Sequence, residues 1–271
     1  MMLANIIFGS LRGKNREDLQ EAADEYLVSL FKGGQISGER LLAWNGGKLN
    51  AHVMLAGPQA MAPRYHTVWG KRELTKVVEL FGRVPVVKIL DDHAVKKTSG
   101  WKNAPFLYLS TTWVDWESPV YRGDGKPAIP FFKLPVPDQV KEDLFGWQRS
   151  YRRLDGLWME SGELEIPTYR QLAVSDSELS KKGRELCAAI ENAVGVPTYY
   201  HLFRFWSRSN DEEGRVCPSC GGGWRNPDWI DFQPFHLFYF KCDVCRLVSH
   251  LGSSPDGSRL ARIGEFVPKS L

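Results

Sequence analysis

The sequence predicts an α+β fold, with a mixed or antiparallel sheet, three main helices and a small cysteine-containing ribbon at the C-terminal end. Three observations predict it. The composition, 43% hydrophobic and 25% charged, is typical of a globular chain. Short apolar runs alternate with amphipathic helix patterns, and two Cys-x-x-Cys pairs lie in the last quarter of the chain. A chain of 271 residues is long enough to bury a full core without disulfide bonds.

The N-terminal segment predicts a strand, a helix and a hairpin. Residues 3–8 form a short apolar run, which predicts a buried strand. In the helix that follows, apolar residues recur at i, i+3, i+4 and i+7, with Asn15 as a plausible N-cap. Residues 36–44 and 48–56 are typical of paired strands, because Asn45 and Gly46 between them are typical of a hairpin turn.

Further strands are predicted along the middle of the chain. Residues 84–90, 106–110 and 129–134 are strand candidates, and Pro85 favours an edge position for the first of them. Residues 198–205 alternate between the two faces of a predicted strand.

Two more helices are predicted before the cysteine pairs. One begins after Pro137 with Asp138 as its cap and carries a single apolar stripe. The next opens with the capping-box pattern Ser175-x-x-Glu178 and ends at Gly195. The polar residues 206–215 that follow predict a linker.

Charge and hydropathy exclude several classes of protein. The net charge of +3 is too small for a strongly basic nucleic-acid coat or an acidic DNA mimic. The apolar run at the N-terminus is too short for a secretion signal, and no stretch approaches the roughly 18 apolar residues of a membrane span. We therefore expect a cytoplasmic protein, in which clustered cysteines suggest a metal site rather than disulfide bonds.

The two Cys-x-x-Cys pairs are the most specific motif. Cys217 and Cys220 form the first pair, and Cys242 and Cys245 form the second, after a gap of 21 residues. Two such turns joined by a hairpin complete a tetrahedral four-thiolate site, so we expect one zinc ion there. A closed site of four thiolates has no open coordination position, which makes the expected role structural rather than catalytic.

Two other interpretations of these cysteines remain open: a set of buried free thiols, and a redox-active pair. The redox interpretation lacks a thioredoxin-like strand and helix around either pair. The fifth cysteine, Cys187, is expected to be a small core residue. The zinc interpretation divides the chain into an α+β domain at 1–205, a C-terminal zinc ribbon at 215–251 and a tail at 252–271.

The residues around the cysteine pairs also carry a resemblance. Its motifs are Pro197-Thr-Tyr-Tyr200, Cys217-Pro-Ser-Cys220-Gly-Gly, Trp224, and Phe240-Lys-Cys-Asp-Val-Cys-Arg-Leu-Val-Ser249. Over residues 196–251 the chain resembles a bacterial family of uncharacterised proteins, described as containing a zinc ribbon and with nucleic-acid binding suggested. The resemblance implies zinc and a bacterial source, and no proven activity.

The charge of the predicted ribbon bears on its partner. Residues 215–251 hold four basic and three acidic side chains, so a zinc ion with four thiolates leaves the segment slightly negative. Nucleic-acid affinity depends on an excess of Lys and Arg, which this segment lacks. Its aromatic side chains, Trp224 and Trp229 among them, can lie in the core, contact a protein or stack on bases.

A second aromatic segment is the expected contact region. The loop over residues 111–130 is rich in Trp, Pro and Gly and holds Trp113, Trp116 and Tyr121. Loops of this length are often functional. Trp and Tyr are also the residues that dominate protein interfaces.

No catalytic motif is present in the sequence. There is no nucleophile elbow, phosphate loop or His-Glu-x-x-His, and residues 91–93 are more typical of a solvated turn than of a metal site. We therefore expect a non-enzymatic binding protein. The first hypothesis is a cytoplasmic immunity or antitoxin-type protein that blocks a toxin by protein–protein interaction. The alternative is a zinc-ribbon regulatory protein that binds DNA or RNA.

Overall fold

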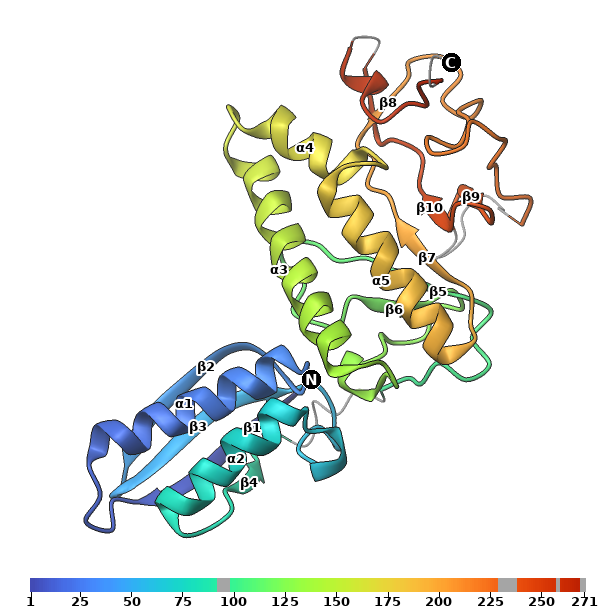
Figure 1. The fold of residues 1–271 in the computed structure, drawn as a ribbon. Helices are drawn as coiled ribbons and strands as arrows, with labels where there is room; N and C mark the ends of the chain where they lie inside the picture. The colour runs from blue at the N-terminus through green and yellow to red at the C-terminus, as the bar shows by residue number, and fades with distance from the viewer. Residues whose placement is uncertain (92–97, 229–237, 257–258, 269–271) are drawn as a thin grey trace. The chain divides into compact units, whose positions relative to one another are not determined.

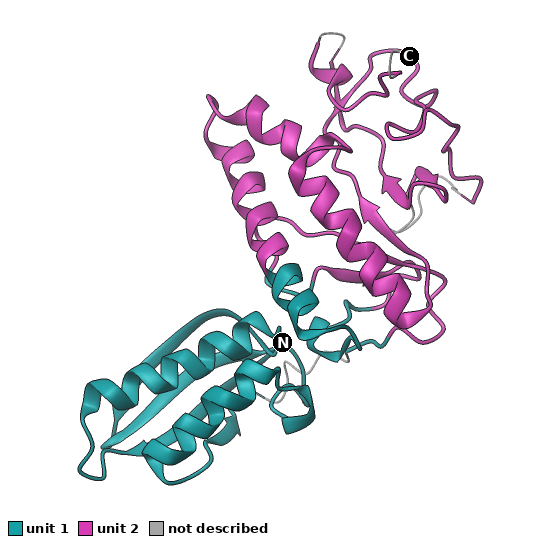
Figure 2. Ribbon diagram, viewed as in Figure 1, with its two compact units in different colours: residues 1–100, 116–118, 127–145 teal, residues 101–115, 119–126, 146–271 magenta. Residues whose placement is uncertain are grey.

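The computed structural model describes residues 1–91, 98–228, 238–256 and 259–268. These residues form two compact units (Figure 2). Unit 1 comprises residues 1–100, 116–118 and 127–145, and unit 2 comprises residues 101–115, 119–126 and 146–271. The α+β class, with antiparallel and mixed sheets, is confirmed.

Unit 1 contains a four-stranded antiparallel sheet and two long helices (Figure 1). The elements follow one another as β1 (Met2–Ser10), α1 (Arg16–Lys32), β2 (Ile36–Asn45), β3 (Lys48–Leu55), α2 (Val68–Phe81) and β4 (Val86–Ile89). The strand order β2-β3-β1-β4 makes this a β-α-β-β-α-β arrangement of the ferredoxin-like type. Two short 3-10 turns, η1 (Pro63–Tyr65) and η2 (Phe131–Lys133), belong to the same unit.

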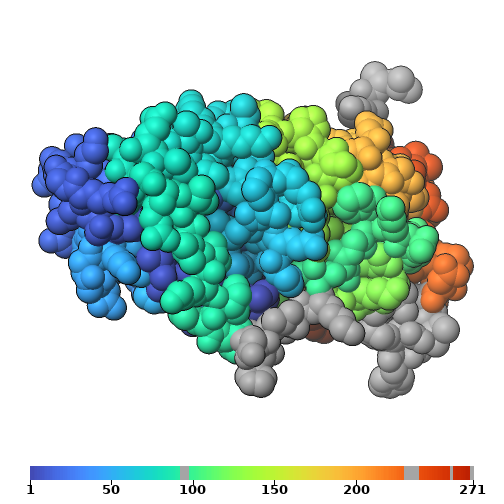
Figure 3. Space-filling model, turned by 90° about the horizontal axis from the view of Figure 1, so that it is seen from below, coloured from blue at the N-terminus to red at the C-terminus, as the bar shows by residue number. Residues whose placement is uncertain are grey.

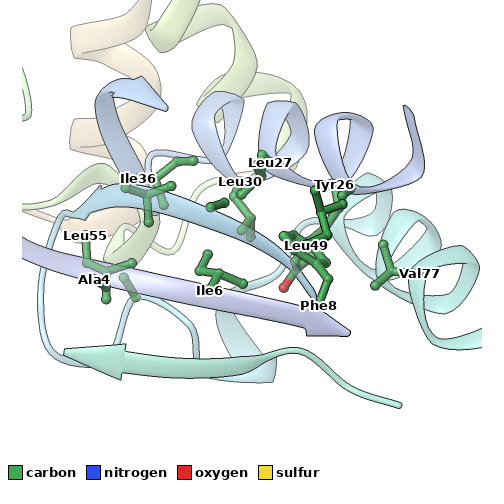
Figure 4. Packing of buried hydrophobic residues seen from close by; sticks show 14 of the residues in the cluster. Ala4, Ile6, Phe8, Tyr26, Leu27, Leu30, Ile36, Leu49, Leu55 and Val77 are labelled. Atoms are coloured by element: carbon green, nitrogen blue, oxygen red, sulfur yellow. The ribbon is translucent and has the colours of Figure 1, made fainter. Parts of the chain in front are cut away.

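The core of unit 1 lies between the sheet and helices α1 and α2. Alternate residues of β1, Ala4, Ile6 and Phe8, are fully buried, and they face Leu27 and Leu30 of α1 (Figure 4). This period of two in the strand and about 3.6 in the helix is what the sequence predicts for half-buried elements. The strand β4 lies at the sheet edge, as expected from Pro85, and the turquoise segment around it reaches the surface in Figure 3.

Helix α2 is the main element that the sequence pattern did not predict. Its buried face consists of Gly70, Glu73, Val77 and Phe81. A glycine and a glutamate interrupt the apolar stripe, and Glu73 is tolerated there because Arg72 and Lys76 pair with its carboxylate at 2.8 and 2.7 Å. An i, i+3, i+4 search for apolar residues therefore misses this helix.

Unit 2 contains a five-stranded mixed sheet in the order β6-β5-β7-β10-β9. The strands are β5 (Leu107–Leu109), β6 (Val120–Arg122), β7 (Thr198–His201), β9 (Phe240–Cys242) and β10 (Leu247–Ser249). β7 is parallel to both β5 and β10, whereas β6 and β9 pair antiparallel at the two edges. A separate parallel pair joins β8 (Trp206–Ser207) to β11 (Ser254–Pro255). The strands that flank the second cysteine pair thus share a sheet with β7.

Helices α3 (Asp138–Glu160), α4 (Glu165–Ala173) and α5 (Glu178–Val194) precede β7 (Figure 1). α5 packs on β7, and Gly183 permits the close approach because a Cβ there would collide with the ring of Tyr200. Among the described residues, none of the helices has the length and hydropathy of a transmembrane span.

Two local predictions are wrong. Residues 129–134 contain the 3-10 turn η2 instead of a strand, because Pro130 lacks an N–H for a sheet ladder, and Lys133 and Leu134 bond back within the turn. Helix α5 is capped by Ser177, whose Oγ accepts from the N–H of Ser180 at 3.1 Å, whereas Ser175 is buried and its hydroxyl faces the carbonyl of Pro218.

The segment 206–215, which the sequence predicts as a linker, is bonded to the residues around it. It begins with strand β8 and ends at Arg215, which is 4% exposed. The Arg215 guanidinium pairs with Glu212 at 2.6 Å and with Glu265 at 3.3 Å. The division of the chain at residues 205, 215 and 251 stays a prediction.

Candidate metal centre

The first cysteine pair lies in a tight turn between two backbone contacts. Val216 and Gly223 form an antiparallel bridge, and the N–H of Cys217 donates to the carbonyl of Gly222 at 2.8 Å. Gly221, directly after the pair, has a φ of +75°, a left-handed conformation that favours glycine. A Cβ at Gly221 would also lie 2.7 Å from the ring of Phe266. Both the backbone conformation and the close approach of this ring therefore require glycine here.

The second cysteine pair lies in the turn between β9 and β10. Its geometry repeats the first: Arg246, directly after the pair, has a φ of +52°. An arginine in this left-handed region is strained. Here its guanidinium Nε and Nη2 donate to the two carboxylate oxygens of Glu191 at 3.0 and 2.9 Å, which holds the side chain in place. The carbonyl of Arg246 accepts from the N–H of Tyr200 at 2.8 Å, which anchors the turn to β7.

The two turns bring the four cysteine sulfurs together. The sulfurs of Cys217, Cys220, Cys242 and Cys245, the four-cysteine cluster, all lie within 4.8 Å of one another. The Cys220 and Cys242 sulfurs are 3.9 Å apart, far beyond the roughly 2.05 Å of a disulfide bond. A tetrahedral zinc ion with Zn–S bonds of about 2.3 Å needs sulfurs that are roughly 3.8 Å apart. The cluster is therefore compatible with a metal site.

Backbone N–H groups reach the sulfurs of Cys220 and Cys242, whereas burial raises the pKa of the Cys217 and Cys245 thiols. The N–H of Gly222 points at Cys220 and holds the pKa of that thiol below its usual value. The N–H of Cys245 donates to the sulfur of Cys242 at 3.4 Å. Cys217 and Cys242 are buried, Cys245 is half-buried and Cys220 is exposed, so one edge of the cluster meets solvent.

Trp224 connects the two cysteine turns through ring stacking and hydrogen bonds. Its indole stacks on Phe240 with ring centroids 4.7 Å apart, and its Nε1 donates to the carbonyl of Arg215 at 3.0 Å. The N–H of Lys241, next to Cys242, donates to the carbonyl of Trp224. Trp224 is 2% exposed, so its position favours the core interpretation over contact with a partner.

The other predicted contact residues are spread over the chain. Trp113 and Trp116 are 42% and 43% exposed, and they belong to unit 2 and unit 1 respectively. Tyr121 is half-buried in β6, where it stacks on Tyr108 with centroids 5.4 Å apart. Trp229 lies outside the described residues. Cys187 is buried in α5, as predicted, away from the cluster.

A cavity of about 840 Å³ borders the four-cysteine cluster at Cys220. Four arginines line it: Arg170, Arg184, Arg259 and Arg262. They come from α4, from α5 and from the segment around the 3-10 turn η3 (Leu260–Arg262). No short motif reveals such a set, because its members are up to 92 positions apart.

Comparisons with known proteins place the chain in a family. Three sequence families match successive segments: DUF8589 at residues 1–91, DUF2310 at 102–203 and DUF8594 at 207–254. Each is described as a domain of unknown function. The chain also aligns with bacterial relatives, so it belongs to a bacterial family of uncharacterised proteins.

Two of these relatives come from Haemophilus influenzae (strain ATCC 51907 / DSM 11121 / KW20 / Rd), and both are described as uncharacterised proteins. Each is 37% identical to the chain over 163 residues, which is 59% of this chain. The aligned part makes up 78% of the first relative and 61% of the second. No solved structure matches the chain. The predicted resemblance to a bacterial uncharacterised family is confirmed, while its zinc ribbon and its link to nucleic acid stay predictions.

Proposed function

We propose that the four-cysteine cluster holds one structural zinc ion, and that the protein is a non-enzymatic binding protein. Four thiols within 4.8 Å are the donor set of closed structural zinc sites. Such a site has no open position for water or substrate, so the ion acts as a scaffold. It would fix the turn before Gly221 to the turn before Arg246, and with them the edge of the unit 2 sheet.

The partner that we propose is a protein, and the observation that carries this is the way Trp113 is presented. The residue is 42% exposed, but its backbone is held by hydrogen bonds. The N–H donates to the carboxylate of Asp155 at 2.8 Å, and the carbonyl accepts from the guanidinium of Arg152 at 3.2 and 3.3 Å. An exposed Trp on a rigid backbone loses little entropy on binding, as hot-spot residues require. An immunity or antitoxin-type protein that covers a toxin fits this presentation.

The charges of the cysteine segment support this choice over nucleic acid. All four basic residues of 215–251 face a carboxylate: Arg215 faces Glu212 and Glu265, Arg225 faces Glu213, Lys241 faces Asp243, and Arg246 faces Glu191. Their charges are already partly neutralised, so this segment has little positive charge left to bind the phosphates of a nucleic acid. The nucleic-acid alternative would need basic residues from elsewhere in the chain.

The zinc and the partner can be tested separately. Metal analysis of the purified chain should find one zinc ion per chain. For the partner, a two-hybrid screen against a genomic library from the host bacterium should yield a protein whose binding is lost in Trp113→Ser. Leu157→Ser is the matched control, because Leu157 lies in the same unit and is 41% exposed. The partner expressed alone should stop growth, and the chain should restore it.

A different result would overturn the partner proposal. If every interaction survived Trp113→Ser, or if the chain instead bound labelled DNA or RNA with a steep dependence on salt, the nucleic-acid alternative would take its place.

A further inference from the structure

The cavity beside the four-cysteine cluster has the size and lining of a ligand site. Its volume of about 840 Å³ falls within the roughly 300–1,000 Å³ of small-molecule pockets. The first cysteine turn contributes Ser219 and Cys220 to the lining, and the C-terminal segment contributes Ile263 and Phe266. All of it lies within unit 2.

The four arginines of this cavity differ from those of the cysteine segment. Among the residues that the structure describes, the guanidinium groups of Arg170, Arg184, Arg259 and Arg262 make no ion pair and no hydrogen bond. Three of them are exposed, and Arg184 is half-buried. Four like charges around one hollow repel one another, and this repulsion is relieved when an anion binds among them.

The acidic residues of the lining do not cancel this charge. Glu265 already pairs with Arg208 at 2.8 Å and with Arg215 at 3.3 Å. Asp176, on the loop before α5, is the other carboxylate of the lining. A surplus of positive charge therefore remains in the cavity.

Compensation of the cluster's own negative charge is a simpler role for these arginines. It would place guanidinium N–H groups against the cysteine sulfurs. Across the described parts of the chain, none of the four arginines donates to a cysteine sulfur, and the backbone N–H groups of Gly222 and Cys245 serve the sulfurs instead. The arginine side chains are thus available to a ligand.

We propose that this cavity binds a phosphorylated small molecule. Guanidinium groups match phosphate oxygens with two parallel N–H···O bonds, and several arginines suit a ligand with two or more phosphates. Ile263 and Phe266 offer an apolar surface to the rest of the ligand, as a nucleoside polyphosphate would require. The site shares no residue with the Trp113 surface. A negative result for the proposed partner therefore does not affect this proposal, and the reverse is also true.

The test is calorimetric titration of the full-length, metal-loaded chain at low salt, with pyrophosphate and with ATP as probes. Arg170→Gln combined with Arg259→Gln should weaken both by about tenfold or more, because each change removes charge-assisted hydrogen bonds. The matched control is Arg153→Gln, which removes one exposed charge from α3 in the same unit, outside the cavity. It should bind as the wild type does. Tighter binding of ATP than of pyrophosphate would support contact between the nucleoside and the apolar side chains of Ile263 and Phe266.

Three results would overturn the proposal: no heat with either probe, equal affinity in the double variant and the control, or binding of a thymidine oligonucleotide without binding of either probe. The last would identify an extended nucleic acid as the ligand. Metal content and melting temperature are measured on each variant. If the double variant loses metal, Arg262→Gln alone provides the comparison.

Discussion

Unit 1 and the C-terminal region of unit 2, residues 206–268, are stabilised in different ways. The three longest strands of unit 1 have 8, 9 and 10 residues and bury one continuous apolar cluster against α1 and α2. The strands described in the C-terminal region have two or three residues each. This region also holds the four-cysteine cluster, which is partly buried, and the buried, ion-paired Arg215. Short strands supply few ladder bonds, and the apolar cluster around Trp206 and Ala261 is smaller than that of unit 1. If the proposed metal ion binds at the cluster, we expect it to supply part of the stability that apolar packing supplies in unit 1.

Removal of one cysteine ligand should give the largest effect and should be confined to unit 2. Cys217→Ser leaves three thiolates, and structural zinc sites contribute roughly 10–16 kcal/mol of apparent binding free energy that is coupled to folding. We expect loss of stoichiometric zinc and loss of hydrogen-exchange protection over residues 215–228 and 238–249. Peptides from β1, β3 and α1 should keep their protection.

Cys187→Ala is the control for this experiment. It also removes a buried thiol from unit 2, but its sulfur lies in α5 and outside the cluster. Zinc stoichiometry should stay unchanged. Equal zinc content in Cys217→Ser and Cys187→Ala would contradict the structural metal site.

The same contrast explains how much of the structure the sequence could predict. In unit 1 the signals are local: the side chain of Asn15 caps α1, and the Asn45–Gly46 turn joins β2 to β3. The cysteine pairs are equally local, because each turn needs only four residues to point two sulfurs at one centre. These features were predicted at the correct positions.

The features that the sequence did not predict depend on distant partners. Glu73 can face the interior of unit 1 only because Arg72 and Lys76 neutralise it, so the stripe of α2 carries a charge. From the sequence, Arg215 is expected at the surface. Its burial depends on Glu265, which lies fifty positions later in the chain and contacts it in the fold. The arginine cavity assembles from three separate segments. Hydrophobic periodicity is a local property of the chain, so it predicts none of these long-range pairings.

Buried and exposed ion pairs provide the second test. Arg215→Met would leave Glu212 without its ion-pair partner and Glu265 with Arg208 alone, which should cost about 3 kcal/mol of unfolding free energy. Arg40→Met in unit 1 breaks a pair with Asp24, which is half exposed, and should cost less than about 1 kcal/mol. Urea unfolding of both variants gives the two values. Similar losses would mean that the pair around Arg215 is not buried in solution.

Acid should weaken unit 2 more than unit 1. Burial lowers the pKa of His201 to about 3 and that of His250 to about 4, from about 6.5 in the unfolded chain. Because protons then bind the unfolded chain preferentially, the stability present above pH 6.5 is lost as the pH falls toward these values. Two such histidines should cost about 2 kcal/mol between about pH 6.5 and about pH 5.5.

The histidine effect has its own controls. His201→Gln should remove about half of the pH dependence of unit 2, with zinc content checked at both pH values. In unit 1, burial also lowers the pKa of His66, whose Nε2 lies 2.8 Å from the Tyr26 hydroxyl, but a single histidine gives a smaller loss. Equal losses of exchange protection in the two units would contradict this account.

The smallest expected effect is the one that should be the same in both units, because helix caps are local. The Asn15 side chain accepts from the N–H of Glu17 at 2.9 Å in unit 1, and Ser177 accepts from the N–H of Ser180 at 3.1 Å in unit 2. Asn15→Ala and Ser177→Ala should each cost about 1 kcal/mol, measured by exchange protection of the first turn of α1 and of α5. A much larger cost for Ser177→Ala would show that this serine supports packing of α5 as well as its first turn, since its hydroxyl also donates to the carbonyl of Gln171 at 2.7 Å.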